Sequence, residues 1–167
     1  MAAIVTIDES NGASEAQTVD IANSNMGNVD DAELNPAAYP ITPGENSYEK
    51  WQRFHVSDMS GSSEISNLKV WRTGALGGAA VHKTNAKTSD YAGAPTYATP
   101  VKTASAIAIN AMPTSAPASA NLGIGGSLAG ALTEEGYSDY LVHQIQTNAA
   151  DVAGSESVLN FQYDEVA

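Results

Sequence analysis

Alternation of apolar and polar residues is clearest close to the C-terminus of the chain. Within Ser157–Val166, large apolar or aromatic residues occupy three alternate positions: Leu159, Phe161 and Tyr163. The residues between them are polar, and side chains of an extended strand point to opposite faces in turn. The pattern predicts an antiparallel strand with one buried face and one solvated face.

Two further segments carry strong strand patterns. In Glu64–Gly74, Leu68 and Val70 are predicted to face one way, while Lys69 and Trp71 face the other. In Tyr137–Thr147 both faces carry apolar residues, which predicts a strand in the middle of a sheet and covered on both sides.

Shorter patterns complete the set. Asn46–Asp58 is predicted to form a strand, and the glycine-containing stretch after it is predicted to turn into Glu64–Gly74. Weaker strand patterns are Ala2–Ile7, Gly78–Thr84, Thr96–Pro100 and Thr103–Ala111. About seven to nine short strands at near-regular spacing predict an all-β chain: a single antiparallel β-sandwich, jelly-roll-like domain.

Residues 10–45 differ from the rest of the chain. They are rich in Asn, Ala, Ser and Asp and contain few large apolar residues, so they bury little surface by themselves. We predict an N-terminal strand and extended arm over residues 1–45 and a sandwich domain over 46–167. On this division, a chain without residues 1–40 is expected to fold.

Charge excludes some classes of partner. The net charge is −12, and all seven Lys and Arg residues lie between positions 46 and 102, together with four acidic residues. Dense positive charge along one face is what nucleic acids and anionic membranes require, so we expect neither partner. The chain has no cysteine, which removes disulfides, thiolate metal sites and cysteine nucleophiles.

A glycine-rich stretch, Ala120–Gly136, raises the question of a phosphate-binding loop. From Gly123 the chain reads Gly-Ile-Gly-Gly-Ser-Leu, so Leu128 occupies the place of the third glycine of a dinucleotide fingerprint. No strand–helix alternation surrounds the stretch. We expect these glycines to allow positive φ in a turn and close approach of another backbone.

Catalytic and metal-binding patterns are weak. His55, His82 and His143 each lie in a predicted strand without ligand spacing, and we expect each to be satisfied at a strand surface. We therefore predict no catalytic, cofactor-binding or metal-binding residue. We also expect the small side chains to let sheets and subunits pack closely, leaving no pocket where reactive groups converge.

Aromatic residues suggest a contact surface instead. Trp71 lies off the predicted core face and has Lys69 and Arg72 as sequence neighbours. Together with Trp51 and with Tyr39 of the arm, these residues are predicted to contact another subunit or partner. A sugar-stacking platform built from Trp71 and nearby tyrosines is the alternative.

Three quoted stretches resemble one family of proteins. "PGENSYEKWQRFHVSDMSGSSEISNLKVWRTG", "MPTSAPASANLGIGGSLAGALTEEGYSDYLVHQIQT" and "LNFQYDEV" are similar to small virion structural proteins of tailed bacteriophages. The resemblance covers about Pro40 to the C-terminus. It implies a β-rich, non-enzymatic component of the particle and carries no defined binding residues.

The resemblance sets the expected function. We expect a capsid decoration (cement) protein that stabilises the head by bridging capsomers and binds the major capsid protein or other virion proteins as a homo-oligomer. It would assemble in the host cytoplasm and lie on the virion surface. A neck or tail virion protein, or a carbohydrate-binding sandwich for host attachment, is the alternative function.

Overall fold

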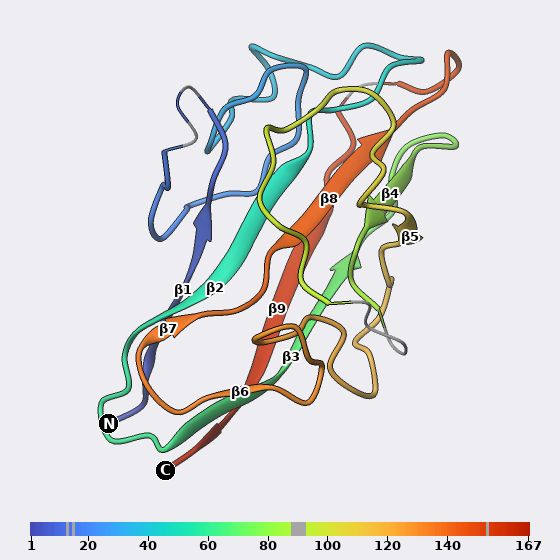
Figure 1. Cartoon of the computed structure of the whole chain (residues 1–167). Coiled ribbons are helices and arrows are strands. Elements are labelled where there is room, and N and C mark those ends of the chain that lie inside the picture. Colours follow the sequence, from blue (N-terminus) through green and yellow to red (C-terminus); the bar gives the residue numbers. More distant parts are fainter. Residues whose placement is uncertain (13, 15, 88–92, 153) are drawn as a thin grey trace.

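The protein is built from strands and long connecting loops (Figure 1). A computed structural model describes residues 1–12, 14, 16–87, 93–152 and 154–167. All pairings between its nine strands are antiparallel, and the described residues contain no α-helix. The all-β, antiparallel class predicted from alternation is thus confirmed.

The larger sheet has six strands. Five of them lie in the order β1 (Ile4–Glu9), β2 (Lys50–Asp58), β8 (Leu141–Gln146), β4 (Val81–Thr84) and β5 (Asn110–Ala111), and β7 (Gly136–Tyr137) pairs with the far end of β2. Strand β8 lies between β2 and β4, as its apolar character on both faces predicts.

The smaller sheet has three strands in the order β6 (Ala131–Leu132), β3 (Glu64–Thr73) and β9 (Val158–Val166). Strands β3 and β9 pair almost along their whole length, from Glu64–Val166 to Thr73–Val158. The chain termini lie close together at one end of the molecule (Figure 1).

Both sheets contribute to one hydrophobic core. Phe54 and Leu141 come from the larger sheet, Leu68 and Val70 from the smaller one, and all four are buried. Phe54 meets Phe161 of β9 edge to face, with ring centroids 5.5 Å apart, an arrangement that aromatic pairs prefer.

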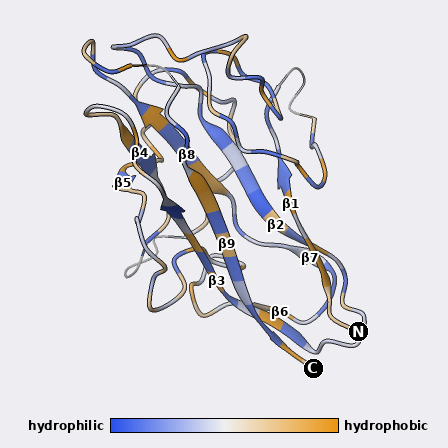
Figure 2. Ribbon diagram, turned by 180° about the vertical axis from the view of Figure 1, so that it is seen from behind, coloured by the Kyte–Doolittle hydropathy of each residue, from blue (hydrophilic) through white to orange (hydrophobic). Residues whose placement is uncertain are grey.

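The predicted facing of residues in β3 and β9 is confirmed. Leu159, Phe161 and Tyr163 pack against the core, and Lys69 and Trp71 lie half-buried on the opposite face of their sheet from the core. Figure 2 shows the resulting alternation of apolar and polar residues along these strands.

One irregularity interrupts β3. The pairing with β9 shifts between Ser66 and Lys69, and Asn67 there has a φ of 53°. An extra residue in one strand is a β-bulge, and asparagine tolerates this left-handed backbone better than most residues. The bulge explains why Ile65 and Leu68, three residues apart, both face the core.

Strand β1 is an integral part of the larger sheet. It pairs with β2 from Ile4 to Glu9, and Val5 and Ile7 pack against the core. The arm begins only after Glu9, where Thr18 and Ile21 form backbone hydrogen bonds to Glu9 and Ile7 at the outer edge of β1. This arrangement argues against the expectation that a chain without residues 1–40 folds. Residues 13 and 15 of the predicted arm lie outside the described residues.

Two predicted strands are wrong or shortened. Thr96–Pro100 forms no strand, and within Thr103–Ala111 only β5 pairs with a neighbour. Tyr97 and Ala108 from this part of the chain instead cover Trp51 on the outer face of the larger sheet. Burial of large side chains, rather than a strand ladder, holds this segment.

Buried amide side chains hold several loops in place. The side chain of Asn121 accepts a hydrogen bond from the Val70 N–H and donates one to the Val70 carbonyl, each at 2.8 Å. Gln144 likewise donates to the Ser47 and Thr103 carbonyls and accepts from the Ser105 N–H. Both residues are fully buried. Their side chains form the hydrogen bonds to backbone N–H and C=O groups that a neighbouring strand would otherwise form.

Candidate functional site

The structure separates the five predicted contact residues. Trp51 has no exposed surface, because Tyr97 and Tyr140 cover it with edge-to-face ring contacts at 5.0 and 5.5 Å. Direct contact between Trp51 and a partner would therefore require the covering loop to move. Tyr39 is 44% exposed and lies on the arm.

Only Lys69 and Trp71 share one surface. They project from β3 on the face that points away from the core, beside Asn160, Gln162 and Asp164 of β9. We call these five residues the β3–β9 face. Arg72 shares the inward side of β3 with Val70, and its guanidinium donates to the Gly74 carbonyl.

The glycine-rich stretch forms a turn, as predicted. Gly125 and Gly126 have φ values of 59° and 80°, and a Cβ at Gly130 would overlap the carbonyl oxygen of Ile124. The Gly126 N–H points at both carboxylate oxygens of Asp139, at 2.9 and 3.1 Å. The chain's own carboxylate thus occupies the position that a bound anion would take at a phosphate-binding loop.

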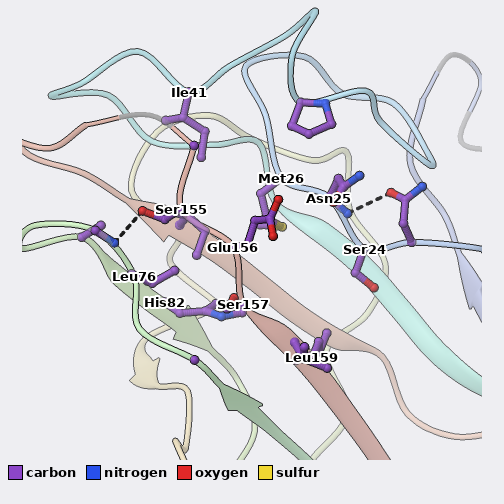
Figure 3. Close-up of a pocket in the computed structure, with 18 of the residues that line it drawn as sticks. Ser24, Asn25, Met26, Ile41, Leu76, His82, Ser155, Glu156, Ser157 and Leu159 are labelled. Atoms are coloured by element: carbon purple, nitrogen blue, oxygen red, sulfur yellow. Dashed lines mark hydrogen bonds between the residues drawn. The ribbon is translucent and has the colours of Figure 1, made fainter.

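A cavity of about 1310 Å³ bears on the expectation that no pocket brings reactive groups together, because two histidines line it. The arm, the loop before β9 and the ends of β4, β8 and β9 surround it, and Figure 3 shows residues of its wall. Met26, Ile41, Leu76 and Leu159 supply apolar wall, and His82 adds an imidazole. His143 lines the same cavity, so two of the three histidines converge there.

A buried polar ladder crosses the inner face of the larger sheet beside this cavity. The Lys50 ammonium lies 2.5 Å from Glu9 Oε1, and Gln52 Nε2 donates to Glu9 Oε2 at 2.7 Å. Gln52 Oε1 lies 3.1 Å from His143 Nε2, and His143 Nδ1 lies 2.8 Å from His82 Nε2. We call Glu9, Lys50, Gln52, His143 and His82 the polar ladder.

The hydrogen bonds of the polar ladder determine which ring nitrogen of each histidine carries the proton. Burial lowers the pKa of His143 well below its usual value and that of His82 to about 3, so both rings are neutral near pH 7. The Gln52 carbonyl oxygen only accepts, so His143 Nε2 carries the proton and its Nδ1 accepts from His82 Nε2–H. His82 Nδ1 is then an unprotonated acceptor, and within the described residues no group donates to it.

Burial and neighbouring charges shift the pKa values of the groups in the polar ladder. Burial raises the pKa of Glu9, and the Lys50 ammonium partly counters that effect. The positive charges of Arg72 and Lys50 add to burial in lowering the pKa values of His82 and His143, respectively. A buried charge that keeps its partner is tolerated, whereas one left alone costs several kcal/mol.

The chemistry available at the ladder is narrow. His82 Nδ1 is itself buried, and with a pKa of about 3 it takes up a proton only in acid. Among the described residues, no group of three or more His, Cys, Asp or Glu side chains is arranged to hold a metal ion. The described ranges likewise contain no helix with the length and apolar character needed to cross a membrane.

The third histidine lies on the opposite face of the larger sheet. His55 Nδ1 is 2.9 Å from Asp8 Oδ2, and its ring stacks on Tyr137 with centroids 4.4 Å apart. The Arg53 guanidinium lies 3.6 Å from the Tyr137 ring centroid, within cation–π range. The surface position predicted for the histidines thus holds for His55 and is wrong for His82 and His143, which are buried.

Comparison of the chain with protein-family models, curated proteins and solved structures found no match.

Proposed function

We propose that the chain is a non-enzymatic structural protein of a tailed-bacteriophage particle, a capsid decoration protein that docks on the outer shell and bridges capsomers. We further propose that its two sheets form a β-sandwich of the jelly-roll-like kind. The sequence resemblance motivates the class of protein, and the properties of the folded body support a role in assembly.

The observation that carries the proposal is the β3–β9 face. Trp71 and Lys69 are held on a long antiparallel strand pair, and aromatic residues are enriched in the centres of protein interfaces. Asn121 fixes the backbone of β3 between these two residues, through both hydrogen-bonding groups of Val70. A surface that is ordered before binding loses little conformational entropy on docking, and the partner we propose for it is the major capsid protein.

Binding to emptied, expanded capsids tests this function. Purified protein should bind at a fixed stoichiometry, and Trp71→Ala should weaken binding by about tenfold or more, as truncation of a central interface aromatic does. Ile109→Ala is the matched control, because Ile109 is 59% exposed and lies outside the β3–β9 face.

Two outcomes would refute the head assignment. Wild-type protein could fail to bind capsids while co-purifying with necks or tails, which would place the chain elsewhere in the particle. Alternatively, Trp71-dependent binding on a glycan array without capsid binding would favour the carbohydrate-binding function.

A further inference from the structure

Strand β9 has one unused edge. It pairs with β3 along one side, and in the described part of the chain no strand pairs with the other side. It is nine residues long, and Val158 and Val166 at its two ends are 61% and 50% exposed. A free edge presents a row of unpaired backbone N–H and C=O groups to any other strand.

Several of the usual protections of an edge strand are missing from β9, whose charged residues are Asp164 and the inward-pointing Glu165. Natural edges are blunted by proline, by lysine, by bulges or by very short length. Val158–Val166 contains no Pro, Gly, Lys or Arg, and the bulge of this sheet lies in β3 rather than in β9. A long edge without proline, lysine or a bulge is open to pairing with a strand of another chain.

The outward row of β9 is almost a palindrome. Residues on this face read Val158, Asn160, Gln162, Asp164 and Val166. If a second copy of β9 runs antiparallel with Gln162 opposite Gln162, all nine residues overlap. Each exposed valine then meets a valine of the other copy, and each Asn160 meets an Asp164.

The inward row is compatible with the same register. Phe161 falls opposite Tyr163, and Leu159 falls opposite Glu165, so no two like charges face each other. Aromatic pairs directly opposite each other stabilise antiparallel strands, and like charges destabilise them. A two-fold axis at Gln162 makes the contact self-complementary, as closed dimers require.

We propose that β9 pairs with β9 of a second copy of this chain, antiparallel and centred on Gln162, so that the smaller sheets of two protomers form one continuous sheet. This inference does not rest on the proposed virion function. A chain that fails to bind capsids could still dimerise in this way, and a capsid-binding chain could remain a monomer.

Charge substitutions test the register in the full-length protein. Asn160→Asp places two carboxylates opposite each other twice per dimer, once at each Asp164. Two such cross-strand pairs are expected to raise the dimer dissociation constant by about 2- to 30-fold. Adding Asp164→Asn to Asn160→Asp restores one amide and one carboxylate in every pair and should bring the constant back to near the wild-type value.

A third variant controls for the added charge. Thr114→Asp adds the same negative charge at an exposed loop residue outside β9 and should leave the dissociation constant unchanged. Analytical ultracentrifugation over a range of protein concentrations measures all four proteins, and circular dichroism confirms that each is folded. The proposal is overturned if the wild type is a monomer or an odd-numbered oligomer throughout, if Asn160→Asp leaves the constant unchanged, or if the double variant fails to recover.

A cross-link provides a test that does not depend on affinity. The chain lacks cysteine, so Gln162→Cys introduces a single thiol at the predicted axis. Directly opposed residues of antiparallel strands have Cα atoms about 4.5–5.5 Å apart, which suits a disulfide. Mild oxidation should convert this variant into a dimer that thiol reductant separates, whereas Thr114→Cys should stay monomeric on a denaturing gel. Equal cross-linking of the two variants would contradict the pairing.

Discussion

Replacing His82 with glutamine is expected to make the folded protein less sensitive to acid. The glutamine amide can donate to His143 Nδ1 as the His82 Nε2–H does, but it does not titrate. The variant therefore keeps the hydrogen bond of the polar ladder and removes one group that must stay neutral in the folded state.

The magnitude follows from the pKa of His82. Its value is about 3 in the folded protein against 6.5 for the ordinary side chain, because burial and the charge of Arg72 disfavour the protonated ring. A histidine with a lowered folded pKa contributes full stability above pH 6.5, and this contribution is lost as the pH falls toward 3. Between pH 7 and pH 5 the loss is about 2 kcal/mol, since protons bind the unfolded state preferentially.

The assay is urea unfolding of both proteins at a series of pH values from about 7 down to about 5. The change of about 2 kcal/mol is expected within this range. The free energy of unfolding of the wild type minus that of His82→Gln should fall by about 2 kcal/mol over this range. Glu9 acts in the opposite direction, because its raised pKa makes its contribution disappear as pH rises above 4.5. Glu9 and His143 are present in both proteins, so their contributions to the free energy of unfolding largely cancel in the difference. Parallel pH profiles for the two proteins would refute a buried, neutral His82.

Three further changes probe the fold. Lys50→Met should cost about 3–5 kcal/mol by leaving the Glu9 carboxylate buried without its cation, and Glu9→Gln added to it should recover much of the loss; urea midpoints measure both. Asn121→Ala should cost about 2–4 kcal/mol, because the N–H and C=O of Val70 lose their buried partners; unchanged thermal stability would contradict this role. Deleting residues 1–9 removes β1 and should yield a chain without cooperative unfolding, whereas deletion of a detachable arm would leave the transition intact.

The strands could be predicted where alternation is local. Leu159, Phe161 and Tyr163 follow one another at every second position, and burial of that face decides their orientation whatever the rest of the chain does. The same reasoning placed Trp71 away from the core. It failed at Thr96–Pro100, where an apparent strand is held by the packing of Tyr97 on Trp51, a contact between residues 46 positions apart.

The polar ladder could not be predicted from spacing along the chain. His82 and His143 are 61 positions apart, and only the antiparallel pairing of β4 with β8 brings them together. One signal was present in β2: Lys50 and Gln52 alternate with Trp51 and continue in phase with Phe54, which places two polar residues on an inward face. Polar residues in phase with a core row indicate a buried partner, although the sequence does not say which one.

The buried amide side chains that hold the loops could not be recognised from the local sequence either. Asn121 and Gln144 read as ordinary loop and strand polar residues, yet each satisfies buried backbone groups far away in sequence. Their importance depends on the tertiary position of those groups, which local patterns do not contain.

The proposed function can be tested most directly by a cryo-electron microscopy reconstruction of the phage particle that carries this chain. We predict density for the two-sheet body on the outer surface of the head, with Lys69 and Trp71 turned toward the capsid protein. Density for the chain in the neck or tail, or a particle that lacks it entirely, would contradict a capsid decoration protein.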